Sequence, residues 1–453
     1  MTAEADGAPV LATPPRPASP LPFWKLLKLA STNTVAVFDE ALFDELFIAR
    51  RYLTQPVFFV SDPDGIKRIL VDNFDNYPRL TPIRRLFAVE LGTGTLASEG
   101  EIWRRHRRVA APTLEPGAIT RDMPAMIALS EAMADDLDAD AGAAPVDLER
   151  WVARLTLRLW SEVATGGDPD VLPMLDHLSK IPRKPRVRDF VPKPAWLERM
   201  LPKDEPRLHS DGFHAQLDRL IAQRGDEAYD GPHDLFWRLA RGKDPQTRER
   251  LPLSEASDEA ASLTAGGAAP IRALTWVWYL LALHPEVERR LHAEVDAVLG
   301  GQPPTAELLP KLVYTRQVLD ETMRLYPPIP AMLREATSED VVCGRRIPRG
   351  AIMMIAPWVV HRHRKLWNDP ERFDPDRFSS KAKSARLRFA YLPFAVGPRT
   401  CIAASFAITE MMMMLTVMAR RFRFRLDPDH PIRPLGRITV KPEGGLRVIV
   451  ERR

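Results

Sequence analysis

The sequence predicts a mainly helical fold with a smaller β region. Apolar residues recur with a helical period along most of the 453-residue chain, whereas runs typical of strands are few and short. The 43 prolines are spread along the chain and punctuate the helical segments. Because apolar residues make up 45% and charged residues 27%, the chain is an ordinary globular protein that can bury a sizeable core.

The first elements follow from proline content and periodicity. Residues 1–22 contain six prolines, which support neither a helix nor a central strand, so we expect a mobile N-terminal tail. Residues 23–453 show no internal repeat and no break between independent units, which predicts a single domain. Within it, residues 57–60 predict a strand and residues 65–71 a short amphipathic helix.

A long central helix is predicted from Ser254 to His284. Ser254 fits an N-cap, and the acidic residues that follow it favour the positive end of the helix dipole. Pro285 stops or restarts the helix, so it spans roughly 45 Å, enough to cross a domain. A further helix is predicted over 312–326, and short strands over 341–347, 352–355 and 446–450.

Composition excludes several classes of protein. Lys and Arg total 64 against 60 Asp and Glu, and a formal charge of +4 excludes a surface dedicated to nucleic acid. The two cysteines, Cys343 and Cys401, exclude a disulfide framework and a zinc site of several thiolates, and indicate the cytoplasm. The most apolar helical window, residues 273–283, is too short for a membrane span, and a secretory signal is not expected.

The most informative stretch is residues 394–401, which reads F-x-x-G-x-R-x-C. We expect a tight turn at Gly397, after which Cys401 opens an apolar helix over residues 402–422. A thiol at a helix N-terminus is stabilised as the thiolate, and such a thiolate can bind a haem iron. Arg399 could meet a haem propionate. A cysteine taken alone is more often a small buried apolar residue than a metal ligand. The complete F-x-x-G-x-R-x-C pattern makes the metal-ligand interpretation the stronger one.

Four further segments match the motifs of one known family, in the order in which that family has them. The chain is therefore identified as a member of the cytochrome P450 superfamily of haem-thiolate monooxygenases, over roughly residues 50–453. They are W-x-x-x-R (Trp103 and Arg107), E-x-x-R (Glu321 and Arg324), Arg334 after a proline-rich turn, and the PERF region over 369–378. The resemblance implies a triangular-prism fold that makes residues 23–453 the catalytic domain. In it, a haem b lies between the long central helix and the helix after the cysteine.

The resemblance also implies residue roles. Cys401 is the expected axial metal ligand of the iron-protoporphyrin IX. The expected cofactor-binding residues are Trp103, Arg107, Arg334, Phe394, Arg399 and Cys401. A buried structural network of Glu321, Arg324 and Arg377 is expected to support the cysteine loop, with Arg377 the stronger candidate for its third member and Arg372 the second.

The central helix departs from the family pattern A/G-G-x-D/E-T. The oxygen-binding groove is expected at Gly266, Gly267, Ala268 and Ala269, where the acid and the alcohol of the proton relay are both replaced by alanine. Pro270 is expected to kink the helix and to leave the Gly266 carbonyl without a partner, although a merely tolerated kink is equally consistent. Water held there, or a substrate hydroxyl, could supply part of the missing relay.

These features favour a soluble, bacterial-type monooxygenase that inserts one oxygen atom from O₂ into a mainly apolar small molecule. Its electrons are expected from a separate ferredoxin and reductase, because the chain carries no flavin or nicotinamide domain. We expect a ferredoxin to dock near Arg104, Arg105 and Arg108; the alternative is a solvated basic face with one propionate contact. The alternatives are a peroxygenase or a dehydration, isomerisation or rearrangement catalyst, and a non-catalytic haem-binding protein.

Overall fold

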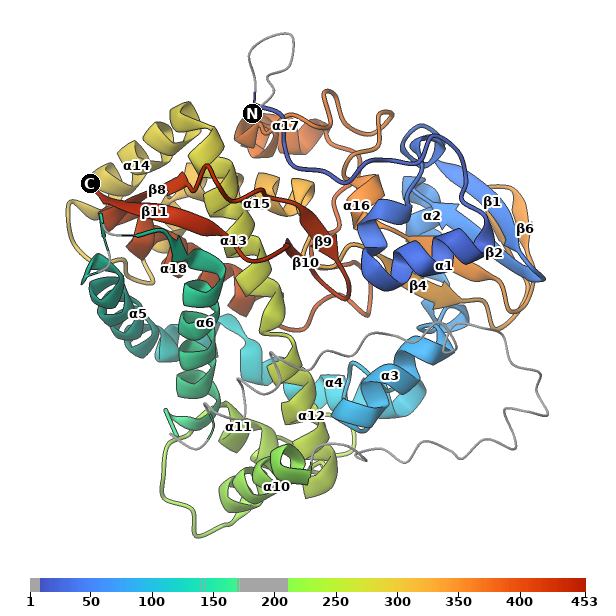
Figure 1. Ribbon diagram of the computed structural model, residues 1–453. Coiled ribbons are helices and arrows are strands. Elements are labelled where there is room, and N and C mark those ends of the chain that lie inside the picture. The colour runs from blue at the N-terminus through green and yellow to red at the C-terminus, as the bar shows by residue number, and fades with distance from the viewer. Residues whose placement is uncertain (1–8, 140, 143, 169–170, 172–210) are drawn as a thin grey trace.

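The computed structural model describes residues 9–139, 141–142, 144–168, 171 and 211–453. Helices make up most of it and enclose the largest apolar cluster, so the predicted mainly helical fold with a smaller β region is confirmed (Figure 1). The longer helices are α3 (Thr81–Leu91), α4 (Gly100–Ala110), α5 (Pro116–Ala139), α6 (Leu148–Thr165), α10 (Asp211–Gly225), α12 (Leu253–Ala265), α13 (Ala268–Leu283), α14 (Pro285–Leu299), α15 (Val313–Leu325) and α18 (Ala404–Arg421). The shorter helices are α1 (Phe23–Thr32), α2 (Pro63–Lys67), α11 (Leu235–Arg241), α16 (Pro357–Val360) and α17 (Ser380–Ala385).

The largest sheet lies at the right of Figure 1, beside α1. Its order is β1-β2-β7-β4, with β2 parallel to β7 and the other pairs antiparallel. Its strands are β1 (Phe47–Tyr52), β2 (Gln55–Val60), β7 (Ile352–Ile355) and β4 (Met332–Glu335). A three-stranded sheet has the order β3 (Val146–Asp147), β11 (Arg447–Arg452) and β8 (Phe422–Leu426). Two further sheets have two strands each: β9 (Pro434–Gly436) pairs with β10 (Val440–Pro442), and β5 (Asp340–Val342) pairs with β6 (Arg345–Ile347).

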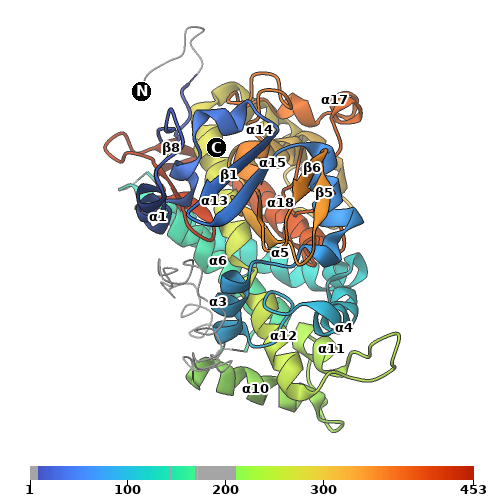
Figure 2. The same cartoon turned by 90° about the vertical axis from the view of Figure 1, so that its right-hand side faces the viewer.

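The central helix is interrupted. α12 ends at Ala265 and α13 begins at Ala268, so the prediction of one continuous helix over 254–284 is wrong (Figures 1 and 2). Around the interruption, backbone N–H groups bond to carbonyls three residues back, with Gly267 donating to Thr264 at 3.1 Å and Ala269 donating to Gly266 at 3.2 Å. The Gly266 carbonyl therefore has a partner, and the prediction that it lacks one is also wrong.

Pro270 explains why the helix breaks where it does. A proline inside a helix offers no N–H and clashes with the carbonyl four residues back, which here is that of Gly266. With α13 restarting at Ala268, Pro270 falls in the first helical turn, where a missing N–H costs little. The two glycines before it adopt the intervening tight turn, so the chain relieves the clash by starting a new helix.

The proline-rich N-terminal segment packs against the core from residue 9 onward. The backbone of Ala12 accepts a hydrogen bond from the Tyr326 hydroxyl at 2.9 Å and donates one to the Tyr279 hydroxyl at 2.8 Å. Leu11 beside it is buried. The prediction of a mobile tail is therefore wrong for residues 9–22, because proline prevents regular structure without preventing tertiary contacts; residues 1–8 lie outside the described part.

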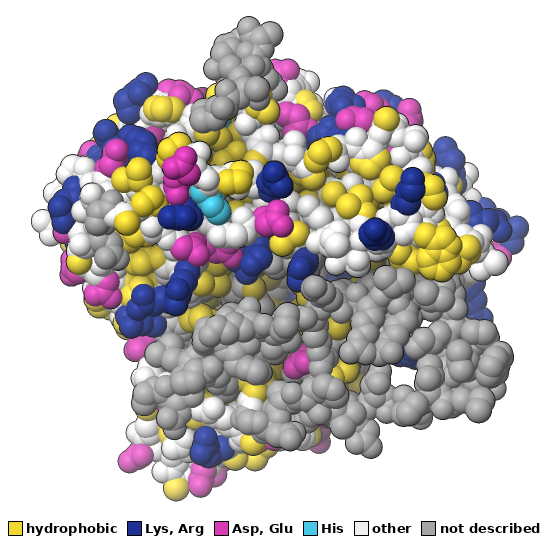
Figure 3. Space-filling view, viewed as in Figure 1, with side chains coloured by type: hydrophobic (Ala, Val, Ile, Leu, Met, Phe, Trp, Pro, Cys, Tyr) yellow, Lys and Arg dark blue, Asp and Glu magenta, His cyan; other side chains and the backbone are white. Residues whose placement is uncertain are grey.

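The outer surface carries charges of both signs. On the face shown in Figure 3, Lys and Arg side chains are interspersed with Asp and Glu among apolar ones, consistent with a net charge of only +4. Within the described part of the chain, no helix has both the length and the apolar character that crossing a membrane requires.

Replacing Pro270 by alanine should change stability little. Because the clash is already relieved, we expect P270A to raise the free energy of unfolding by less than about 1 kcal/mol, instead of the ~3 kcal/mol typical of a helix interior. Pro124 provides the matched control, since it is exposed and lies inside α5. Thermal unfolding of both variants tests this; a gain for P270A as large as that for P124A would contradict it.

Candidate functional site

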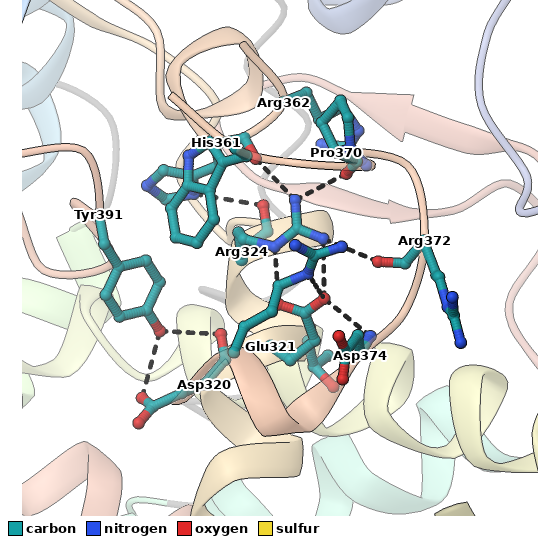
Figure 4. A network of polar contacts seen from close by, with 12 residues as sticks. Asp320, Glu321, Arg324, His361, Arg362, Pro370, Arg372, Asp374 and Tyr391 are labelled. Carbon is teal, nitrogen blue, oxygen red and sulfur yellow. Dashed lines mark hydrogen bonds and ion pairs between the residues drawn. The ribbon is translucent and has the colours of Figure 1, made fainter. Parts of the chain in front are cut away.

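Arg324 is the centre of the most extensive buried polar network in Figure 4. Its five N–H donors all find acceptors: the two oxygens of Glu321 at 2.6 and 2.7 Å, and the carbonyls of His361, Pro370 and Arg372 at 2.7 to 3.0 Å. Glu321 and Arg324 share one face of α15, three residues apart, and both side chains are fully buried. This arrangement ties α15 to the irregular chain that follows α16.

Glu321 completes the network on its acidic side. Its Oε1 accepts the backbone N–H of Asp374 at 3.0 Å and lies 3.5 Å from the Nε of Arg377. The Arg377 side chain also donates to the Asp369 carbonyl at 2.8 Å. Arg372, in contrast, contributes its backbone carbonyl to Arg324. The structure thus places Arg377, and not the side chain of Arg372, beside the Glu321–Arg324 pair.

His361 connects this network to the cysteine loop. Its Nδ1 bonds to the Arg324 carbonyl at 3.2 Å, and its Nε2 accepts the backbone N–H of Leu392 at 2.8 Å. Burial, reinforced by the positive charge of Arg324, lowers the pKa of His361 to about 3. The ring is therefore neutral at physiological pH, with Nε2 free to accept. Leu392 lies two residues before Phe394, where the F-x-x-G-x-R-x-C segment begins.

The cysteine loop closes on itself through Phe394. The Phe394 carbonyl accepts the backbone N–H of Cys401 at 2.8 Å and the hydroxyl of Thr400 at 3.1 Å. Gly397 has a φ of 78°, and a Cβ at this position would lie 2.0 Å from the Leu70 carbonyl oxygen. Only glycine permits both the backbone conformation and this close approach, so the glycine of the motif is required by packing.

Cys401 does not open a helix as predicted. α18 begins at Ala404, three residues later, so the thiol lies in the loop before the helix. Its side chain is accessible but has protein on most sides, and burial raises the pKa of the thiol, against smaller opposing effects of the Ala403 backbone N–H and Arg107. The expected lowering by the helix dipole is therefore wrong for the free thiol. Coordination to a metal ion would deprotonate it outright.

Three of the predicted cofactor-binding residues meet beside this loop. Arg107 on α4 donates to the Thr400 carbonyl at 2.6 Å, directly before Cys401. The Arg399 guanidinium lies 4.0 Å from the centre of the Trp103 ring, also on α4, and pairs with Glu99. The i, i+4 spacing of Trp103 and Arg107 accounts for this, because it places both side chains on one face of the helix.

Arg334 lies deeper, and it brings with it a residue that sequence reasoning missed. Arg334 on β4 forms an isolated antiparallel bridge with Arg79, whose guanidinium lies 3.5 Å from Glu99. Burial, followed by the charges of Arg79 and Arg399, lowers the pKa of Arg334 to about 9. Arg79 belongs to no sequence motif, because it lies beside Arg334 only through the pairing of two segments that are distant in the sequence.

The arginine cluster fits a ligand with two carboxylates. Among the described residues, Glu99 is the carboxylate that pairs with Arg79 and Arg399, while Arg334 forms no ion pair and Arg399 Nε is buried without a hydrogen-bond partner. Uncompensated buried positive charge is costly. Haem carries two propionates, so its binding would supply the missing negative charge next to Cys401.

The predicted oxygen-binding groove coincides with the interruption between α12 and α13. Gly266 is exposed, and Gly267, Ala268 and Ala269 are half-buried, although these helices cross the middle of the molecule in Figure 1. The side chains of Ala268 and Ala269 are methyl groups, which cannot donate or accept a proton. Any proton movement by the protein at this position must therefore use other residues.

The three arginines expected to attract a ferredoxin are paired within the chain. Arg104 donates to Asp75 at 2.6 Å, Arg105 pairs with Glu255, and Arg108 binds Asp244 and Glu101. These carboxylates offset much of the local positive charge. The docking role of Arg104, Arg105 and Arg108 stays a prediction.

Comparison with known proteins identifies the family of the chain. The family model described as Cytochrome P450 matches residues 14–448. The chain is 32% identical to cyclooctatin synthase of Streptomyces melanosporofaciens, over 88% of this chain and 87% of that protein. It is 31% identical to cyclooctat-9-en-7-ol 5-monooxygenase of the same organism, over 81% and 80%. It is 36% identical to pentalenene oxygenase of Streptomyces avermitilis, over 52% of each chain.

Arg324 should not tolerate lysine. Lysine has three donors for five buried acceptors, so R324K leaves at least two hydrogen bonds unmade. Each unmade bond costs about 1–3 kcal/mol, and together they amount to a large part of the free energy of unfolding of a typical protein. We expect loss of folded, haem-containing protein, measured by soluble yield and haem content. The control is R316K on the same helix, whose arginine forms an exposed pair with Asp320 and should matter by less than about 0.5 kcal/mol. A stable, haem-replete R324K would contradict this interpretation.

His361 should make the folded state sensitive to acid. The ring is neutral when folded but binds a proton below about pH 6.5 when unfolded, so stability falls as the pH falls from 6.5 toward 3. This single group contributes a slope of up to about 1.4 kcal/mol per pH unit. We expect H361Q to lower stability at pH 7 but to reduce the loss between pH 6.5 and 4.5, measured as thermal midpoints. Thermal midpoints of wild type and variant that fall in parallel with pH would contradict the prediction. Buried His292, whose pKa is also lowered, contributes the same pH dependence to both proteins and cancels in the comparison.

Proposed function

Because the chain belongs to the cytochrome P450 family, which binds haem through a cysteine thiolate, we propose that it is a monooxygenase acting on a largely apolar substrate, in which the Cys401 thiolate would hold the haem iron. The overall change is RH + O₂ + 2e⁻ + 2H⁺ → ROH + H₂O. The observation that carries the proposal is the accessible Cys401 thiol at the end of a loop that is bordered by buried arginines in excess of carboxylates.

The residues of this chain would act by binding and orienting the cofactor. Arg79, Arg334 and Arg399 would hold the propionates, while Trp103 keeps the Arg399 guanidinium in place by stacking beneath it. Arg107 fixes the Thr400 carbonyl and thereby the position of the neighbouring sulfur. When bound, haem supplies the one-electron and dioxygen chemistry that no side chain can perform.

The class of substrate is inferred from the relatives. The names pentalenene and cyclooctat-9-en-7-ol denote an alkene and an unsaturated alcohol, so we infer an unsaturated, largely hydrocarbon substrate for this chain as well. Such a molecule offers few groups for ionic recognition, and its binding would depend on apolar contacts. We further propose a separate ferredoxin-type electron donor, since the cytochrome P450 family match accounts for residues 14–448.

A second candidate follows from the methyl side chains at positions 268 and 269. An enzyme without the usual acid and alcohol could use hydrogen peroxide, which carries its own protons, in a peroxygenase reaction. The same substitutions are compatible with a reaction that consumes no oxidant, such as a rearrangement. Product formation with peroxide alone, or without oxygen, separates these candidates from the monooxygenase.

Serine at position 401 should abolish the thiolate. We expect C401S to lose the characteristic absorption of the reduced carbon monoxide complex and to lose turnover to background, because a hydroxyl remains protonated and binds iron weakly. The control is C343S, which removes the other cysteine, on the loop between β5 and β6. A C401S protein that kept the thiolate spectrum would overturn the assignment of the ligand.

The reaction itself is tested by reconstitution. With a surrogate ferredoxin, its reductase, NADPH and air, we expect pentalenene or cyclooctat-9-en-7-ol to shift the haem spectrum and to yield a product that contains one atom of ¹⁸O from labelled dioxygen. Product without label, or product formed only with peroxide or under nitrogen, would favour the second candidate. No spectral response to either molecule or to related apolar alkenes would contradict the substrate class.

A further inference from the structure

The buried polar contacts between α4 and α12 offer a proton path that the family motif lacks here. His106 on α4 is completely buried and lies between two carboxylates of α12: its Nε2 is 2.9 Å from Glu255 and its Nδ1 is 3.2 Å from Glu259. Figure 2 shows α4 beside α12, with the interruption before α13 further along the same helix axis. A histidine with one carboxylate on each nitrogen can accept a proton on one side and release one on the other.

The path is open to solvent at one end and continues inward at the other. Glu255 keeps a quarter of its side chain exposed and also pairs with Arg105. Glu259 is fully buried and accepts both the backbone N–H and the hydroxyl of Thr95, each at 2.8 Å. The order from the surface inward is therefore Glu255, His106, Glu259 and Thr95.

The inner end of the path lies against the helix turn that leads to the groove. Gly94, next to Thr95, packs so closely on α12 that a Cβ there would lie 2.0 Å from the Ser262 hydroxyl. That hydroxyl is buried and has no hydrogen-bond partner within the described part of the chain. Ser262 precedes Gly266 by four residues, one helical turn, and so shares its face of the helix. An unpartnered buried hydroxyl at this place is suited to bind water or to pass on a proton.

We propose that Glu255, His106, Glu259 and Thr95, continued by Ser262 and water, form the proton-delivery path of this enzyme in place of the acid and alcohol replaced by Ala268 and Ala269. The proposal rests on the proposed monooxygenase function, which consumes two protons per turnover. In each transfer the Nδ1–H bond of the doubly protonated His106 ring breaks and an O–H bond forms on Glu259, which leaves a neutral ring with its proton on Nε2. Rotation of the ring then turns the bare Nδ1 toward Glu255, which gives it a proton and takes another from solvent, and rotation back restores the starting state. Glu259 passes its proton inward through the Thr95 hydroxyl.

The surroundings of His106 are consistent with this role. The charged groups that face it are Glu255 and Glu259 from α12, and its neighbours Arg105 and Arg107 on α4, of which Arg107 also interacts with Glu259. Although burial opposes the charged form, bonding to both carboxylates prevails and raises the pKa of His106. The two carboxylates thus favour the protonated form of the buried ring. Alternatively, the same contacts only fasten residues 92–95 to α12, and the experiment must separate the two roles.

The test compares E259Q with a matched control. We expect E259Q and H106Q to lower the yield of product per NADPH consumed by at least about tenfold, because a general acid contributes on the order of 10²–10⁴-fold to a rate. Both variants should also increase the solvent deuterium isotope effect on product formation. Turnover driven by hydrogen peroxide should be unchanged, because peroxide brings its own protons. Glu294 provides the control, since it also accepts the N–H and hydroxyl of one threonine, Thr315, but between α14 and α15; E294Q should retain wild-type coupling.

A readout independent of turnover is the protonation of His106. In the diamagnetic ferrous carbon monoxide complex with ring-¹⁵N-labelled histidine, we expect the His106 resonance, assigned by its absence in H106Q, to titrate at lower pH in E259Q than in wild type. Should E259Q fail to bind haem, T95V removes the hydroxyl alone and should uncouple in the same way.

The outcomes separate the proposals. Wild-type coupling and isotope effect in both E259Q and T95V, with product from dioxygen, would overturn the path and leave the monooxygenase function intact. Changed thermal stability or substrate affinity with unchanged coupling would show that the contacts only fasten residues 92–95, and would also overturn it. A wild-type protein that forms product only with peroxide would contradict the monooxygenase function itself.

Discussion

The guanidinium of Arg324 is the constraint on which the cysteine loop depends. Five donors in a rigid plane meet five acceptors from Glu321 and three separate carbonyls, in a place with no access to water. Because each unmade bond would leave a buried polar group unsatisfied, the chain after α16 can follow only one course. His361 extends the network to Leu392, because its Nε2 accepts the Leu392 backbone N–H. Leu392 lies two residues before the loop that contains Cys401. The position of one sulfur is thus determined by a network that does not touch it.

A second constraint is electrostatic. Arg79, Arg334 and Arg399 are brought together with Glu99 as their shared carboxylate, and burial disfavours their charge strongly enough to lower the pKa of all three. The excess of positive charge makes the protein without haem less stable than it would be with two propionates present. Cofactor binding and folding are coupled through this cluster in the same sense as for other ligands that bind only the folded state.

The interruption of the central helix changes how the distal side can work. Pro270 forces α13 to restart, and the alanines before it remove the side chains that would handle protons there. The same helix carries Glu255 and Glu259 on its earlier turns, where a completely buried histidine joins them to α4. In the proposed path, proton chemistry shifts from one position of the helix to another roughly three turns earlier, while the backbone at Gly266 remains accessible.

The sequence by itself determined the features that local patterns encode. The F-x-x-G-x-R-x-C loop, the helical spacing of Trp103 with Arg107 and of Glu321 with Arg324, and the mainly helical fold all follow from short-range order. Only the tertiary structure decided where α18 and α13 begin, that residues 9–22 pack on the core, that Arg79 lies beside Arg334, and that His106 joins Glu255 to Glu259 and Thr95. These features depend on contacts between residues distant in sequence, whose burial and hydrogen bonding override local propensity.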